Sequence, residues 1–296
     1  MNHLTPTRCL AGLLALAVTG APAPCQRPPA PPRPAARAPE QQRPEKLTEW
    51  PELKKADRDR ARASAKQLRK TKEALRNAAV EKLVAMGAGV APVLIPLVSD
   101  RPQNVNASLF AVLDRVTDAR HAALLGRESG RKSVAWRRYL TRRLAGLRDV
   151  ELLPLLRKRF EDKDEDIAFY ASLGALALGD DGGLDTVLKA ARERWTEQRE
   201  LIAATLTPAR SAAVGLKVWE RIGAARPTDK MAGLRLLRYL ATEDQKMLLR
   251  SYLESADFAV KRAAINAARV LHGEPALEKL SSFQAINLAK QWLQKL

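Results

Sequence analysis

Apolar residues recur every three or four positions from Leu47 to the end of the chain. Three apolar stripes are clear. The first is Leu140, Leu144 and Leu147; the second is Ile167, Ala171, Ala175 and Leu178; the third is Val260, Ala264, Ala267 and Leu271. This spacing is the period of an amphipathic α-helix, whereas the alternation expected of a half-buried strand is missing. We therefore predict an all-α domain over residues 46–296.

The predicted helices form a repeat. One recurring helix begins near residues 73, 104, 132, 165, 198, 229, 258 and 283. Further helices are predicted between these at 90–98, 150–160, 184–195, 209–222 and 246–254, with a short one near 276–280. A period of about 30 residues with two helices per unit is typical of an α-solenoid, in which stacked pairs share one core. The pattern predicts roughly seven stacked antiparallel helix pairs.

Two segments carry a family resemblance, 164–180 (DEDIAFYASLGALALGD) and 255–273 (SADFAVKRAAINAARVLHG). Each has an acidic turn, then an apolar step, alanines, a leucine and a glycine, and so resembles the second helix of a HEAT repeat. Asp164 and Asp257 are predicted helix caps, and Gly179 and Gly273 predicted helix ends. The resemblance implies a binding scaffold and no particular reaction. Armadillo-like or TPR-like pairing is the alternative.

The first 45 residues differ in composition from the rest. Leu10 to Val18 is an unbroken apolar run, which is typical of a secretory signal peptide and too short to span a bilayer. Residues 22–44 contain nine of the 18 prolines, which prevents regular structure because proline lacks a backbone donor. We predict a signal peptide over 1–23 and a disordered Pro-rich linker over 24–45. Lipidation of Cys25 and the cleavage position stay open.

The chain carries 51 basic and 33 acidic residues, a formal charge of +18. Residues 46–296 keep 46 basic and 31 acidic residues, so most of the excess lies in the helical domain. It is concentrated in 54–76, with ten basic residues, and in 131–148, with seven basic and no acidic ones. Such a surface attracts polyanions with an affinity that depends on salt. A solvated basic surface without a ligand is the alternative.

The second helices contribute the candidate binding residues. These are Arg137, Arg138, Arg142, Arg143, Arg235, Arg238, Lys261 and Arg262. In HEAT-like arrays the second helices usually line the concave side, so these cations are predicted to share a groove.

Catalysis and metal binding have no support in the sequence. Both cysteines, Cys9 and Cys25, precede the helical domain, and the three histidines are widely separated. The acidic run 161–166 has the D-x-D-x-D spacing of a calcium loop, but the glycine and the bidentate glutamate of an EF-hand are replaced by Ile167 and Leu173. No G-x-S-x-G, Walker or G-x-G-x-x-G motif occurs. We therefore predict no enzyme, no cofactor and no metal site.

Three functions remain in view. The first is an exported, non-enzymatic HEAT-like scaffold, periplasmic, envelope-bound or secreted, that binds an unknown protein partner without a transmembrane span in the mature chain. The others use the basic face to bind nucleic acid or an anionic envelope component, either acidic polysaccharide or lipid headgroups. The sequence favours the scaffold, with polyanion binding as the alternative.

Overall fold

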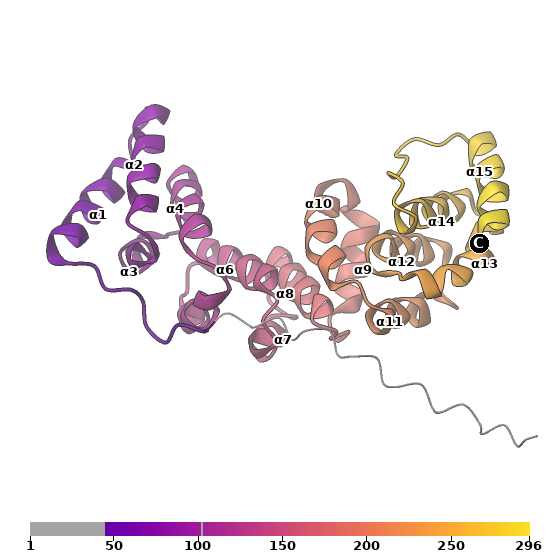
Figure 1. Ribbon diagram of the computed structural model, residues 1–296, viewed down its shortest axis with the longest axis horizontal. Coiled ribbons are helices and arrows are strands. Elements are labelled where there is room, and N and C mark those ends of the chain that lie inside the picture. Colours follow the sequence, from indigo (N-terminus) through magenta and orange to yellow (C-terminus); the bar gives the residue numbers. More distant parts are fainter. Residues whose placement is uncertain (1–44, 102) are drawn as a thin grey trace, which may run out of the picture. The chain divides into compact units, whose positions relative to one another are not determined.

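A computed structural model describes residues 45–101 and 103–296, and this part of the chain consists of helices joined by turns and loops, without a strand (Figure 1). The all-α prediction is therefore confirmed for these residues, and the architecture is compatible with a helical-repeat fold. The predicted signal peptide, 1–23, and the predicted linker, 24–45, lie outside the described residues except for residue 45.

The α-helices of the first half are α1 (Lys55–Gln67), α2 (Glu73–Ala85), α3 (Ala91–Leu94), α4 (Gln103–Val116), α5 (Ala122–Arg127), α6 (Val134–Leu147), α7 (Leu153–Arg157) and α8 (Glu165–Ala177). Those of the second half are α9 (Leu184–Glu193), α10 (Trp195–Leu206), α11 (Ala212–Ile222), α12 (Pro227–Leu240), α13 (Arg250–Leu253), α14 (Phe258–Leu271) and α15 (Ser282–Lys295). The recurring helices α2, α4, α6, α8, α10, α12, α14 and α15 begin within three residues of their predicted starts.

The recurring helices pack against one another in chain order. Contacts join α2 to α4, α4 to α6, α6 to α8, α12 to α14, and α14 to α15. Between α8 and α12, both α9 and α10 contact each of these two helices. The shorter helices α7, α11 and α13 pack on α8, α12 and α14, respectively, which is the pairing that the repeat predicts.

The helix ends follow local rules that were visible in the sequence. The Asp164 carboxylate accepts a hydrogen bond from the Ile167 amide (3.1 Å), and the Asp257 carboxylate accepts from the Ala259 amide (2.8 Å). Gly179 (φ 87°) and Gly273 (φ 76°) adopt the left-handed conformation that ends a helix. The predicted caps and helix ends are confirmed.

The buried apolar residues form two clusters that meet on α8. The N-terminal cluster runs from Ala61 to Ala175, and the C-terminal cluster runs from Phe169 to Trp292. Because α8 supplies buried residues to both, it is apolar on nearly all sides. Its contact with α6 is close, since a methyl group on Gly174 would lie 2.6 Å from Cβ of Ala145.

Two features of the helix prediction need correction. Residues 274–281 are not helical. The side-chain amide of Asn266 pairs with the backbone of Leu277, and Arg269 donates to the Pro275 carbonyl (2.8 Å), so α14 fixes this loop in an extended path. Helices α1 and α5 were not predicted. Ala122–Arg127 is too short to show a clear period, and Lys55–Gln67 is mostly charged, with only Ala61 and Ala65 buried.

Candidate functional site

The eight predicted cations lie on three helices, four on α6, two on α12 and two on α14. Their surroundings differ, so the structure divides the predicted groove into parts with different chemistry.

On α6, Arg137 and Arg138 face the acidic turn, which we define as Asp162, Asp164 and Asp166. Arg138 donates to the Asp164 carboxylate (2.6 Å) and lies 3.5 Å from Asp166, while Arg137 lies 3.7 Å from Asp162. The hydrogen bond to Asp164 raises the pKa of Arg138 above its usual range. Burial pushes the pKa of Asp164 upward, but the bonds from Arg138 and the Ile167 amide outweigh it and leave that pKa low. The carboxylates thus neutralise both arginines.

Arg143 also has an internal role. Its guanidinium donates to the Thr117 carbonyl and to the Asp114 carbonyl (3.2 Å), and it lies 3.7 Å from the Asp114 carboxylate. These acceptors lie at the end of α4, where helical carbonyls lack partners and attract a cation. Arg143 therefore ties α6 to α4.

Arg142 is the exception on α6, because it is exposed and has no ion pair or hydrogen bond to the described residues. It lines a cavity of about 440 Å³ between α6, α8 and α10, which we call the α6–α10 pocket. Other residues of this pocket are Tyr139, Arg143, Arg148, Tyr170, Leu173 and Leu201. Tyr139 is held in place, since its hydroxyl donates to Asp114 (3.0 Å) and its ring stacks on Phe110 with centroids 4.1 Å apart. Arg148 is likewise exposed and has no ion pair or hydrogen bond to the described residues, so the pocket offers two free guanidinium groups beside ordered aromatic rings.

On α12, Arg235 and Arg238 lie against Trp195, the first residue of α10. Their Cζ atoms lie 5.2 Å and 5.1 Å from the indole ring centroid, within the range of a cation–π contact. Arg235 also donates to the Ala191 carbonyl (2.6 Å) at the end of α9. Arg238 is only 5% exposed, its Nε has no hydrogen-bond partner, and no carboxylate of the described residues lies within 4 Å. Burial lowers the pKa of both guanidinium groups.

A third arginine and one glutamate adjoin this pair. Arg199 of α10 lies 3.1 Å from Glu278 of the non-helical loop 274–281. Against the effect of burial, the neighbouring Tyr239 and, to a smaller extent, Glu278 raise the pKa of Arg238, whereas Arg199 lowers it, so these groups are close enough to act on the buried cation. We call Trp195, Arg199, Arg235, Arg238 and Glu278 the Arg238 cluster.

Lys261 and Arg262, the two cations of α14, belong neither to the α6–α10 pocket nor to the Arg238 cluster. Lys261 lies 5.6 Å from the Phe258 ring centroid, and the buried Nε of Arg262 has no hydrogen-bond partner. Neither side chain forms an ion pair with the described residues.

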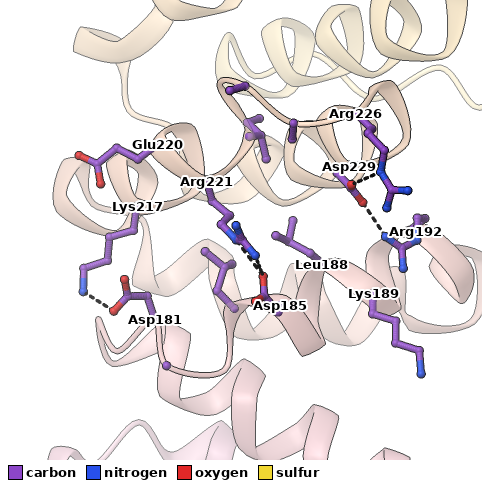
Figure 2. Close-up of a pocket in the computed structure, with 15 residues that line it drawn as sticks. Asp181, Asp185, Leu188, Lys189, Arg192, Lys217, Glu220, Arg221, Arg226 and Asp229 are labelled. Carbon is purple, nitrogen blue, oxygen red and sulfur yellow. Dashed lines mark hydrogen bonds and ion pairs between the residues drawn. The ribbon is translucent and has the colours of Figure 1, made fainter.

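The largest of these cavities is balanced in charge. It measures about 1,090 Å³ and lies between α9, α11 and α12. Figure 2 shows Lys217 and Arg221 facing carboxylates, and Lys217 lies 3.1 Å from Asp181 and Arg221 2.7 Å from Asp185. Arg192 and Arg226 similarly share Asp229. Glu220 forms no ion pair with the described residues, but every cation of the lining does, so this cavity has less to offer an anionic ligand.

Sequence reasoning did not find Trp195, Arg199 or Glu278 as site residues. Trp195 belongs to the C-terminal cluster, and its ring also contacts two arginines. The one available signal was the spacing of Arg235 and Arg238, which places them on the same face of a helix.

Two further features of the described residues concern metal binding and membranes. No group of three or more His, Cys, Asp or Glu residues suited to a metal ion occurs within 45–101 and 103–296. Over the same residues no single helix is long and apolar enough to cross a membrane. One bent pair of helical segments, Glu73–Ala85 with Ala88–Leu97, has the length and apolar composition of a membrane span.

Comparisons with known proteins give one structural match. No protein-family model and no curated protein matches the chain. A solved structure of human deoxyhypusine hydroxylase in complex with glycerol is similar, with 15% sequence identity and a TM-score of 0.34. The match covers 81% of this chain and 98% of that chain.

This match corrects one prediction. We predicted no enzymatic activity partly because a helical-repeat fold implies none, yet the matched chain is a hydroxylase. That step in the reasoning is wrong, and the prediction is withdrawn. A similarity of this size carries no argument for any activity of the present chain.

Proposed function

We propose that this chain is an exported HEAT-like α-solenoid of roughly seven helix pairs that binds a protein partner through the α6–α10 pocket. The observation that carries the proposal is the unpaired Arg142 beside Tyr139 and Tyr170 in an open cavity. Arginine and tyrosine are the residue types that dominate binding energy at protein interfaces. An acidic side chain next to an apolar one on the partner would fit this composition.

The pairing of charges on α6 supports a protein partner over a polyanion at this pocket. A polyanion is held by a row of free cations, each of which releases a counterion. Here Arg137, Arg138 and Arg143 already face carboxylates or carbonyls, which leaves Arg142 and Arg148 as the two free cations at this pocket rather than a row of them. A mixed surface of this kind favours a partner of defined shape with one well-placed carboxylate.

A photo-crosslinking amino acid at Ala204, which is exposed and lines the pocket, tests the proposal in cells. Position Leu216 on α11, which is 46% exposed, is the control. We expect a discrete protein adduct at 204 that is absent at 216 and falls at least fivefold with Arg142→Glu but not with Arg221→Glu. Equal adducts at both positions, or an adduct unaffected by Arg142→Glu, would contradict the assignment.

Export is tested separately by fractionation of cells that produce the full chain with a C-terminal tag. The apolar run at 10–18 and the Pro-rich segment support an exported protein. A full-length chain found only in the cytosol would remove export from the proposal.

A second candidate function rests on a different helix. Six of the ten basic residues between Lys54 and Arg76 are exposed and have no ion pair with the described residues, namely Lys54, Lys55, Lys66, Arg69, Lys70 and Lys72. This stretch, covering α1 and the turn after it, is suited to a polyanion such as an acidic envelope polysaccharide, an anionic lipid surface or nucleic acid. Polyanion binding is therefore proposed for α1, in place of the groove expected along the second helices.

A further inference from the structure

Arg238 poses a physical problem. The Arg238 guanidinium is 5% exposed and so loses most of its hydration. No neighbouring carboxylate among the described residues compensates for that loss. The ring face of Trp195 compensates in part, but Arg235 shares the same ring and adds a like charge. A buried cation left in this state is destabilising unless another anion reaches it.

The surrounding charges define what that anion should be. Arg199, Arg235 and Arg238 bring three positive charges, and Glu278 brings one negative charge. The remaining charge of +2 matches a dianion. A phosphate group carries about −1.5 to −2 at neutral pH and accepts the paired hydrogen bonds that guanidinium groups donate.

Glu278 and an anionic ligand would compete for the same partner, Arg199. It belongs to the loop 274–281, which Asn266 and Arg269 hold against α14, and its carboxylate reaches Arg199 on α10. The Glu278 side chain remains 56% exposed, so moving it away from Arg199 breaks one partly solvated ion pair.

We propose that the Arg238 cluster is a phosphate-binding site, in which a phosphate or phosphate monoester binds Arg199, Arg235 and Arg238 and replaces Glu278 as the partner of Arg199. Glu278 is thus an internal competitor that weakens binding until a ligand with a higher charge arrives. This site is separate from the α6–α10 pocket, so its failure leaves the proposed function unaffected.

The test is isothermal titration of the full chain with inorganic phosphate and, in a parallel arm, with glycerol 3-phosphate, at constant ionic strength. We expect saturable binding of at least one probe. Arg199→Gln should weaken it at least fivefold, whereas Glu278→Gln should tighten it two- to fivefold because the competing carboxylate is gone. Arg221→Gln, which removes an exposed and paired arginine of the Figure 2 cavity, is the control and should leave binding unchanged.

The two probes separate the sources of the phosphate. Preference for glycerol 3-phosphate indicates an organic phosphate, and equal or better binding of inorganic phosphate indicates the free ion. Arg238→Gln should abolish binding, but this buried position affects folding, so the exposed Arg199 and Glu278 variants decide the matter. No saturable binding of either probe, or identical affinity in the Arg199→Gln and Glu278→Gln variants, would overturn the proposal.

Discussion

The two basic stretches of the chain, 54–76 and 131–148, are alike in sequence and different in structure. On α6 of the second stretch, Arg137, Arg138 and Arg143 are bound to groups from α4 and from the acidic turn before α8. In the first stretch, six of the ten cations are exposed and form no ion pair with the described residues, and the pairs that α1 does form, such as Arg60–Asp57 and Arg62–Asp59, lie within α1 itself. The reason is position, because α6 contacts α4, α5 and α8, whereas α1 contacts only α2 and α3 to a comparable extent. A run of arginines therefore marks a binding surface only where no neighbouring helix supplies carboxylates.

The largest effect is expected from separating α6 from α8. Gly174→Ala places a methyl group 2.7 Å from Cα of Ala145, and a backbone atom cannot move aside as a flexible side chain can. We expect a loss of about 2–3 kcal/mol in the free energy of unfolding, measured by urea titration. Gly146→Ala on α6 is the control, since nothing lies within 4 Å of its added methyl, and it should be neutral or stabilising by up to about 1 kcal/mol. If both variants change the free energy of unfolding alike, close packing of α6 on α8 is not what holds Arg137 and Arg138 at the acidic turn.

A smaller effect is expected at the acidic turn. Asp164→Ala removes both the cap of α8 and the partner of Arg138, and should reduce the free energy of unfolding by about 1–2 kcal/mol. Asp59→Ala on α1, whose pair with Arg62 is exposed, should change it by less than about 0.5 kcal/mol. Equal losses in the free energy of unfolding would mean that the ion pairs of the two stretches contribute equally to stability.

Polyanion affinity tests the exposed cations of the first stretch, residues 54–76. Changing Lys54, Lys55, Lys66, Arg69, Lys70 and Lys72 to Gln should weaken binding of heparin or duplex DNA at least tenfold, about 1.4 kcal/mol, and flatten its salt dependence. Changing Arg137, Arg138 and Arg142 to Gln should alter the affinity less than threefold, because two of these cations are already neutralised. Fluorescence anisotropy across a salt series measures both. A larger loss from the α6 variant would reverse our assignment.

The smallest effect concerns pH. The folded-state pKa of Asp164 lies below its ordinary value of 3.8, so its contribution to stability is present above pH 4 and is lost as the pH falls through the folded-state value. Arg138→Gln removes a group that lowers this pKa and should reduce the acid sensitivity of unfolding below pH 4. Arg62→Gln on α1 is the matched control and should leave the profile of the free energy of unfolding against pH as in the unchanged protein. Identical profiles for all three proteins would show that the Arg138–Asp164 pair contributes nothing measurable.

The helices were predictable because their signals are local. Apolar period, capping aspartates and left-handed glycines act within a few residues, and the recurring helices begin close to the predicted positions. The loop 274–281 was misassigned because its path depends on Asn266 and Arg269, which pair with its backbone from the preceding helix. That pairing forms only once α14 is folded, and so leaves no periodic trace in the sequence.

The site was predictable only as a set of candidate residue types. Arg142 and Arg238 belong to the same predicted groove, but one is exposed beside tyrosines and the other is buried against Trp195. The difference arises from contacts between helices that are 25 or more residues apart in the chain, which local patterns do not encode.

The sequence by itself therefore determined that residues 46–296 form helices, where most of the long ones begin, and that the domain is strongly basic. Only the tertiary structure decided which of the cations are neutralised, which is buried without a carboxylate, and which remain free. The physical reason is that a helix is specified by neighbours within one or two turns, whereas the state of a charge depends on every group that packing brings within a few ångströms of it.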